Sequence, residues 1–349
     1  MAMTRNTFLA YVAAMALLFA CAPRASATFP GKNGRIAFVV GSNIFTMKPD
    51  GSDVKQITSF ASTDATFGED WSPDGTRLVF AKAKADFSAS AIWIMNADGS
   101  EQQQLLNDPS GFDDEPRFSP DGSHVVFQRC LSTSDACSIF RIRTDGSDFT
   151  QLTPYTDNTD EEDLTPAYSP DGSQIAFFGV DRDGIISAID VMNSDGANIR
   201  QLSPAALEAF IPDWSPDGTK IVFSTRAFYA PNTINAQLWM MNADGSGIKQ
   251  LTFPGAAAAD TFVSWAPQGN AVVFERDTAT SSGIYVLTVS EAGCFEKLIF
   301  HGPTRASLGS AQPPQTSGRF AGRFAAVAKI SARRIESGGS GPRWGPAPN

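Results

Sequence analysis

Short apolar segments separated by polar turns recur along most of the chain. Several of these segments are apolar at both odd and even positions. They are residues 92–95 (IWIM) and 238–241 (LWMM), and also residues 77–80 (RLVF) and 220–223 (KIVF), each of which begins with one basic residue. A strand with one face in water alternates apolar and polar residues, so strands of this kind belong to sheets that are covered on both faces. No helical periodicity of useful length interrupts them. The pattern predicts an all-β fold.

Two turn motifs repeat with one common period. An aromatic residue followed by Ser-Pro-Asp-Gly occupies residues 71–75, 118–122, 168–172 and 214–218, with a decayed copy at 265–269, and successive prolines are 47, 50, 46 and 51 residues apart. An Asp-Gly pair at residues 50, 98, 145, 195 and 244 keeps the same period, and Ala292-Gly293 is a worn sixth copy. Proline sets φ early in such a turn, and glycine takes the left-handed conformation that closes the hairpin. The repeat therefore predicts six β-units.

The units form a ring in this interpretation. Each unit supplies four antiparallel strands, and a ring of blades covers both faces of every sheet, which a two-layer sandwich does not. We therefore expect a six-bladed β-propeller of four-stranded antiparallel blades over residues 28–303. The first unit lacks the full motif and carries Phe29-Pro30 in its place. Either residues 28–30 form a short first strand, or the first blade has three strands.

The two-part repeat resembles that of the TolB-type, WD40-like propellers. The resemblance rests on Trp-Ser-Pro-Asp-Gly, an apolar strand, Met-Asn-x-Asp-Gly-Ser and Gln-Leu-Thr, and it extends from Phe29 to about Ile299. TolB carries a separate α/β domain ahead of its propeller. Here the repeat begins at Phe29, almost directly after an A-x-A signal cleavage site at residues 25–27. The resemblance implies a propeller that binds protein partners at its channel face.

The first 27 residues are typical of an export signal. Arg5 is followed by a short apolar stretch over residues 8–20, and residues 25–27 form an A-x-A cleavage site. The stretch is too short for a transmembrane helix, which needs roughly 20 apolar residues, so we expect no transmembrane segment and a secreted or periplasmic protein. The alternative is a lipoprotein attached through Cys21, because residues 18–21 loosely resemble a lipobox.

Cysteine usage fits an oxidising compartment. Cys130 and Cys137 flank a short polar loop between two predicted strands, and we predict that they form a disulfide across this hairpin. Metal binding by the two thiols is the alternative, but no histidine or second cysteine pair is placed to complete a site. Cys294 has no predicted partner.

Charge is divided unevenly along the chain. The net charge is −10, and the tail from Thr304 holds seven basic residues against the single acidic Glu336. The preceding body is therefore more acidic than the whole chain. It repels nucleic acid and anionic lipid, so we expect a neutral or cationic partner and no nucleic acid.

Residues for catalysis are scarce. The chain has two histidines, His124 and His301, neither near a nucleophile-elbow sequence, and no Gly-x-Ser-x-Gly motif. Propeller enzymes that use clustered histidines with a metal need more of them. The aspartates of the turn motifs are explained by local hydrogen bonds to main-chain amides. We expect no cofactor and no catalytic residue.

Acidic residues gather just before the first strand of successive units. Because the units repeat around an axis, these segments should emerge on one face near the channel. The candidate partner-binding residues are Asp70, Asp114, Glu115, Glu162, Asp163, Asp213 and Asp260. They would capture a basic loop of a partner or, weakly, a calcium ion. The alternative is a set of solubilising loop carboxylates.

Residues 304–349 are rich in Ser, Gly, Pro, Ala and Arg and carry no repeat. We expect a basic, disordered tail. Within it, Phe320, Phe324 and Val327 follow a helical spacing among basic residues, so the alternative is a short amphipathic helix against the acidic body or an anionic surface.

These features together predict an exported, monomeric, non-catalytic module that binds a protein or peptide on its channel face. The competing hypothesis is an extracytoplasmic hydrolase or lyase that acts on a peptide or saccharide through channel carboxylates. The scarcity of histidine favours the binding module.

Overall fold

The computed structural model describes residues 32–301, apart from positions 85, 107, 109–110, 132–135, 156–161, 181–186, 226–235, 256–257, 279–280 and 291–292, together with residues 343–346. The predicted export signal, Cys21, residues 28–30 and the possible helix of the tail lie outside these described residues. The prediction of an all-β chain is confirmed: the described residues form 24 strands and one short 3-10 helix, Ala205–Leu207.

The strands of the first half of the chain are β1 (Asn33–Val40), β2 (Asn43–Met47), β3 (Lys55–Gln56), β4 (Asp64–Trp71), β5 (Arg77–Lys84), β6 (Ser90–Asn96), β7 (Gln103–Gln104), β8 (Gly111–Phe118), β9 (His124–Leu131), β10 (Cys137–Arg143), β11 (Thr150–Gln151) and β12 (Glu162–Tyr168). Those of the second half are β13 (Gln174–Val180), β14 (Ser187–Asn193), β15 (Arg200–Gln201), β16 (Ala209–Trp214), β17 (Lys220–Thr225), β18 (Leu238–Asn242), β19 (Lys249–Gln250), β20 (Ala258–Trp265), β21 (Ala271–Thr278), β22 (Ser282–Ser290), β23 (Gly293–His301) and β24 (Arg343–Pro346).

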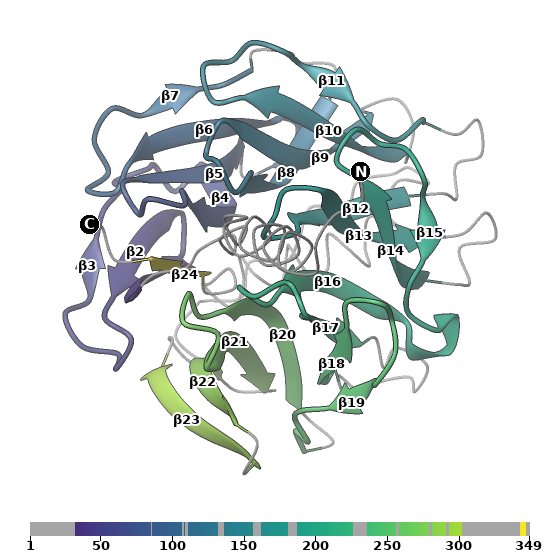
Figure 1. The fold of residues 1–349 in the computed structure, drawn as a ribbon. Helices are drawn as coiled ribbons and strands as arrows, with labels where there is room; N and C mark the ends of the chain where they lie inside the picture. The colour runs from purple at the N-terminus through teal and green to yellow at the C-terminus, as the bar shows by residue number, and fades with distance from the viewer. Residues whose placement is uncertain are drawn as a thin grey trace, which may run out of the picture.

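The strands pair with their neighbours in sequence. Three four-stranded sheets have the orders β24-β1-β2-β3, β16-β17-β18-β19 and β20-β21-β22-β23, and the strands from β4 to β15 form one twelve-stranded sheet. Inside this large sheet, antiparallel pairing is interrupted at two single parallel bridges, Ser90 with Phe112 and Cys137 with Glu162. Figure 1 shows the sheets arranged around a common centre, with β4, β8, β12, β16, β20 and β24 innermost. The structure is a propeller-type fold.

The main turn is built by its aspartate and glycine. In the first full copy, Gly75 has φ 69° and donates its N–H to the carbonyl of Ser72. Asp74 Oδ1 accepts from Ser72 Oγ at 2.6 Å and from the N–H of Thr76 at 3.0 Å. Asp121, Asp171 and Asp217 repeat these contacts. The structural interpretation of the turn aspartates is therefore confirmed.

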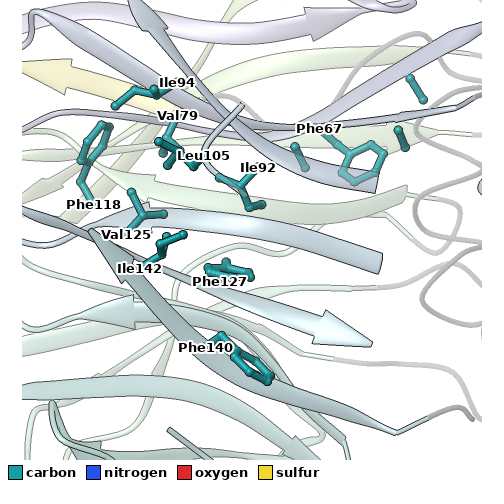
Figure 2. Packing of buried hydrophobic residues seen from close by; sticks show 13 residues of the cluster. Phe67, Val79, Ile92, Ile94, Leu105, Phe118, Val125, Phe127, Phe140 and Ile142 are labelled. Atoms are coloured by element: carbon teal, nitrogen blue, oxygen red, sulfur yellow. The ribbon is translucent and has the colours of Figure 1, made fainter. Parts of the chain in front are cut away.

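Both faces of the sheets are covered, as the apolar strands predict. Successive residues of β5 point to opposite neighbours: Leu78 packs with residues of β1 and β2, while Val79 packs with residues of β9 and β10. Figure 2 shows the second of these interfaces, where Val79, Ile92 and Phe67 meet Val125, Phe127 and Phe140. Burying two faces in this way requires a neighbour on each side of every sheet.

The first sheet packs against the last. Ile36 and Phe38 of β1 share a buried cluster with Ala271 and Val273 of β21. The side-chain carbonyl of Asn33 accepts the N–H of Gln268 at 3.1 Å. A Cβ on Gly51 would overlap the carbonyl of Ile299 in β23, so glycine is required there for the two sheets to approach. The ends of the repeat are thus brought together.

The strand beside β1 comes from the far end of the chain. In β24, Trp344 lies opposite Ile36 and Arg343 opposite Ala37, which is the register that Trp71 and Asp70 of β4 keep with Leu78 and Val79 of β5. Residues 343–346 (RWGP) are therefore a sixth, degenerate copy of the aromatic-Ser-Pro motif. The sequence predicts a disordered tail over residues 304–349, and for these four residues that prediction is wrong. Neither alternative for the first unit anticipated a strand from the C-terminal end.

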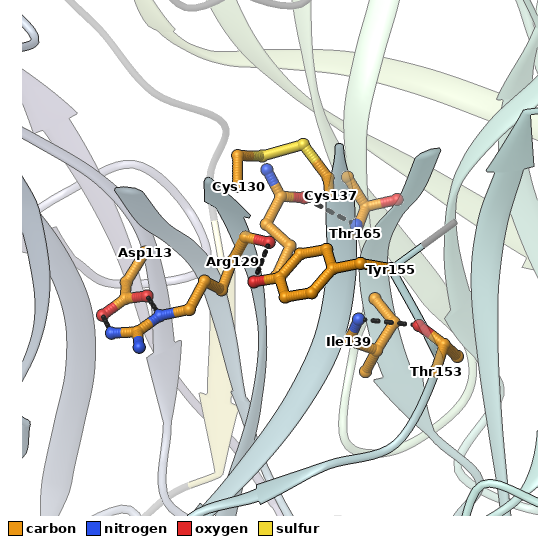
Figure 3. Close-up of a disulfide and its surroundings, with 9 residues drawn as sticks. Asp113, Arg129, Cys130, Cys137, Ile139, Thr153, Tyr155 and Thr165 are labelled. Atoms are coloured by element: carbon orange, nitrogen blue, oxygen red, sulfur yellow. Dashed lines mark hydrogen bonds and ion pairs between the residues drawn. A yellow bond between two sulfur atoms is a disulfide. The ribbon is translucent and has the colours of Figure 1, made fainter. Parts of the chain in front are cut away.

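The predicted disulfide is confirmed. Cys130 and Cys137 lie directly opposite each other on β9 and β10, with their Cα atoms 4.0 Å apart. Figure 3 shows the bond bridging the two strands beside Thr165. Both residues are buried against Leu164 and Phe178.

We predict that Gly345→Ala weakens the attachment of β24. A Cβ at this position would overlap the indole ring of Trp71, and relief of such an overlap costs typically about 1 to 3 kcal/mol. The thermal midpoint should fall, and limited proteolysis should release the C-terminal end earlier than in the wild type. Gly255→Ala is the matched control, because nothing lies within 4 Å of a Cβ there. Equal behaviour of the two variants would contradict the placement of β24.

We predict that reduction of the Cys130–Cys137 bond lowers the free energy of unfolding by about 2 kcal/mol, because a closed loop of this length restricts the unfolded chain. The melting temperature should fall by about 5 °C in calorimetry with reductant. The double variant Cys130→Ser, Cys137→Ser should start at the lower value and show no response to reductant. A response of the double variant equal to that of the wild type would rule out this bond as the cause.

Candidate functional site

A cavity lies where the innermost strands end. Its aromatic lining residues are Trp71, Phe118, Tyr168, Trp214 and Trp265, the last residues of five such strands. Its charged lining residues are Asp70, Arg117 and Asp213, and Ala167, Ser264, Pro216 and Pro267 complete it. All of these residues belong to the same part of the repeat, so the cavity is a direct product of the repeat and lies at the end of the inner strands that carries the Ser-Pro-Asp-Gly turns.

Each inner strand is bulged just before it reaches the cavity. The pairing register shifts within β4, β8, β12, β16 and β20, each time near the aromatic residue that ends the strand. In β4, which ends at Trp71, the shift lies between Phe67 and Asp70, and the other four strands have it at the equivalent positions. The residue inside the bulge has a left-handed backbone, with φ between 49° and 65° at Gly68, Glu115, Thr165, Ile211 and Phe262. Bulges re-aim the side chains that follow them and recur beside functional sites.

Asp70 of β4 faces the cavity from within the protein. It is half-buried, and its Oδ2 accepts the N–H of Phe118 at 2.9 Å, which links β4 to β8. Burial raises the pKa of Asp70 to about 6, and the positive charge of Arg117 opposes that rise. The acid is therefore poised to gain or lose a proton near neutral pH.

Asp213 of β16 repeats this arrangement. Its Oδ2 accepts the N–H of Trp265 at 2.7 Å, which links β16 to β20. Burial raises the pKa of Asp213 to about 7; the hydrogen bond from Trp265 and the charge of Arg117 lower it, and the charge of Asp70 raises it further. The two carboxyls are thus coupled to each other and to one guanidinium.

Arg117 and Arg343 supply the positive charge. Arg117 Nη2 lies 3.5 Å from Glu115 Oε2, and Arg343 Nη2 lies 3.8 Å from the same oxygen. Arg343 also donates to the carbonyl of Val263 at 3.2 Å. Neither arginine is among the site residues predicted from the sequence. The sequence does contain a signal for them. The residue just before the aromatic of each motif copy is, in chain order, Asp70, Arg117, Ala167, Asp213, Ser264 and Arg343.

Several buried donors at the cavity have no acceptor among the described residues. They are the indole Nε1 atoms of Trp71, Trp214 and Trp265 and the Nε atom of Arg117. A buried N–H without an acceptor costs free energy, and tryptophan normally finds a partner for its indole N–H when it is buried. Trp239, which does not line the cavity, has the same unpartnered indole N–H, so these donors are not particular to the cavity.

The family assignment follows from the sequence. The family described as TolB beta propeller domain matches residues 40–231 and 160–316. The chain belongs to this family. A search of the curated proteins finds no match.

Solved structures agree with this TolB-type fold. TolB from Acinetobacter baumannii matches with a TM-score of 0.63 and 17% identity, over 90% of this chain and 67% of that protein. A putative TolB from Agrobacterium tumefaciens matches with a TM-score of 0.59 and 18% identity, over 78% and 91%. Oligogalacturonate lyase from Vibrio parahaemolyticus matches with a TM-score of 0.51 and 16% identity, over 72% and 73%. At these identities the likeness concerns the fold alone.

The seven predicted acids of this TolB-type propeller separate into different environments. Asp70 and Asp213 line the cavity, and Glu115 reaches its edge through Arg117. Asp114 is buried within the bulge of β8, where its Oδ1 accepts the N–H of Glu115. The structure therefore brings together three of the seven residues.

The remaining three acids lie toward the opposite ends of the inner strands. Asp260 is fully buried and accepts two hydrogen bonds from Arg276, at 2.5 and 2.7 Å, within its own sheet. Asp113 and Arg129 form the same kind of pair, which Figure 3 shows. Glu162 and Asp163 are half-buried at the start of β12. A single acidic channel face is therefore not what the described residues form.

Within the described residues, no group of three or more His, Cys, Asp or Glu side chains is arranged to hold a metal ion. In the same part of the chain, no helix has the length and apolar character to cross a membrane.

We predict that Asp213→Asn stabilises the protein in a pH-dependent way. Between about pH 4 and 7 the folded protein retains a proton on Asp213 that the unfolded chain, with an ordinary pKa of 3.8, has released. The free energy of unfolding of the wild type therefore falls as pH rises through this window. Asparagine can still accept from Trp265, so the variant should be more stable at pH 8, on the order of 2 kcal/mol, and equal to the wild type near pH 4.

Thermal melts at the two pH values measure this difference. Asp217→Asn is the control, with an expected effect of opposite sign. Partial burial raises the pKa of Asp217, but hydrogen bonds from Ser215 and Thr219 outweigh burial, so the pKa is lowered. Loss of this carboxylate should therefore lower the stability of the protein at pH 8. A shift for Asp213→Asn that does not change with pH would contradict the burial of this charge.

Proposed function

We propose that this protein is an exported, non-catalytic binding module. Its repeat closes as a ring of six four-stranded blades, with residues 343–346 completing the first blade, and the cavity at the ends of the inner strands holds part of a protein or peptide partner. The observation that carries this proposal is the cavity itself, which is lined by five aromatic side chains, two half-buried acids and Arg117. Aromatic anchoring surfaces with a few polar groups are typical of recognition sites.

Export is supported by the A-x-A site at residues 25–27 and by the Cys130–Cys137 disulfide. Disulfides persist in extracytoplasmic compartments and are rare in the cytosol. We propose a soluble, secreted or periplasmic monomer, with lipid attachment through Cys21 as the alternative.

Ser123, His124 and Asp148 lie close together, as the residues of a catalytic triad do. His124 Nδ1 lies 2.7 Å from Ser123 Oγ, and its Nε2 lies 3.5 Å from Asp148 Oδ2. Ser123 Oγ is also held by Asp121 at 2.8 Å, as Thr76, Ser173 and Thr219 are held by the turn aspartates of other units. The serine has the role of a turn residue, which supports binding over hydrolysis. A hydrolase or lyase acting through Asp70 and Asp213 remains the alternative function.

Partner capture tests the proposal. We predict that the immobilised protein retains a partner from the extracytoplasmic fraction of its source, and that Ala167→Phe, which fills the cavity, loses it. Ala197→Phe adds the same ring on an exposed outer turn and should retain the partner. Should Ala167→Phe fail to fold, Ser264→Gln obstructs the same cavity. Retention of the partner by a folded cavity variant would overturn the proposal.

A further inference from the structure

The cavity carries an excess of negative charge. Three carboxylates, Asp70 of β4, Glu115 of β8 and Asp213 of β16, face two guanidinium groups, Arg117 of β8 and Arg343 of β24. Tyr168 of β12 and Ser264 of β20 line it as neutral groups. With these three acids ionised, the described residues around the cavity carry one negative charge in excess.

An excess charge in an enclosed site is relieved by a proton or by a cation. Isolated ionised carboxylates are costly away from water, so they either take up a proton or pair with a positive group. Arg117 serves both Asp70 and Asp213 and is shared with Glu115. A second positive group placed between the two aspartates would allow both to remain ionised.

The aromatic lining of the cavity favours an organic cation over a metal ion. The two aspartates are surrounded by five aromatic side chains, those of Trp71, Phe118, Tyr168, Trp214 and Trp265. A cation beside aromatic faces gains attraction from the ring quadrupoles, and tryptophan gives the most. A calcium ion instead needs six to eight oxygen ligands, and no group of three or more candidate ligand side chains gathers in the described part of the chain.

The unpartnered indole N–H groups do not define the ligand. Those of Trp71, Trp214 and Trp265 are buried, and Trp239, which does not line the cavity, has the same unpartnered donor. The peptide nature of the ligand therefore follows from the proposed binding function.

We propose that the cavity binds the primary ammonium group of a lysine side chain, presented by a peptide segment of the partner, between Asp70 and Asp213. This inference rests on the proposed binding function and specifies the chemistry of its site. Lysine fits better than arginine because its ammonium is a compact charge on an apolar stem, which suits a small aromatic-walled cavity. The net negative charge disfavours an anionic group.

Binding is coupled to pH. Protonated aspartates no longer attract an ammonium group, and the elevated pKa values of Asp70 and Asp213, about 6 and about 7, place this change between pH 5 and pH 8. Affinity for lysine should therefore rise with pH across this range, while the ammonium itself stays charged because its pKa is about 10.

Short peptides test this inference directly. The probes are acetyl-Gly-Lys-Gly-amide, the same peptide with an acetylated lysine side chain, and acetyl-Gly-Glu-Gly-amide, titrated into the purified protein by calorimetry with indole fluorescence as a second readout. We predict that the lysine peptide binds at pH 8 at least tenfold more tightly than either other peptide, and at least tenfold more tightly than it does at pH 5. Asp70→Asn and Asp213→Asn should each lose this preference.

Asp195→Asn is the matched control, since Asp195 lies on an exposed outer turn and its loss should leave binding unchanged. Equal affinity for the lysine and acetyl-lysine peptides, preference for the glutamate peptide, or no binding of the lysine peptide at millimolar concentration would each overturn the inference. If partner capture still depends on the cavity in any of these cases, the proposed function stands and the lysine assignment alone is wrong. If the peptide binds but no partner depends on the cavity, the proposed function is wrong.

Discussion

The burial of both faces of each sheet is the constraint on which the rest of the structure depends. Leu78 and Val79, adjacent in β5, pack against different groups of strands on the two faces of β5, and the same holds for Ile36 and Ala37 in β1. Flat stacking would leave the outermost faces in water, so the sheets are arranged around an axis and the first packs on the last. The inner strands then converge, and their last residues must share one enclosed space.

That convergence explains the character of the site. The residue before the last aromatic of an inner strand would be exposed in an isolated hairpin, but here five such residues line one cavity. Asp70 and Asp213 use one oxygen each to hold the next inner strand, through Phe118 and Trp265. The same residues thus tie neighbouring strands together and place two acids with raised pKa values at the cavity. The burial that raises these pKa values is therefore a consequence of how the inner strands meet.

The repeat allowed the all-β propeller and the turn aspartates to be predicted, because local turn chemistry and strand periodicity are written in consecutive residues. The disulfide followed from two cysteines that flank a hairpin loop. The strand formed by residues 343–346 escaped prediction because four residues lie far from β1 in sequence and inside a segment of low-complexity composition. The site was predicted in part: abundance of acids pointed to Asp70 and Asp213, but pairing of Asp260 with Arg276 and the roles of Arg117 and Arg343 depend on contacts between distant strands.

Convergence of the inner strands encloses the acids at their ends, and the ionisation of Asp213 reports this enclosure most directly. Carbon-13 NMR of protein labelled at the aspartate carboxyl carbons, with the Asp213 signal assigned by its absence from Asp213→Asn, follows the titration of that one group. Enclosure predicts a midpoint near pH 7. A midpoint near the ordinary value of 3.8 would show that water reaches the carboxylate freely and would contradict the closed arrangement.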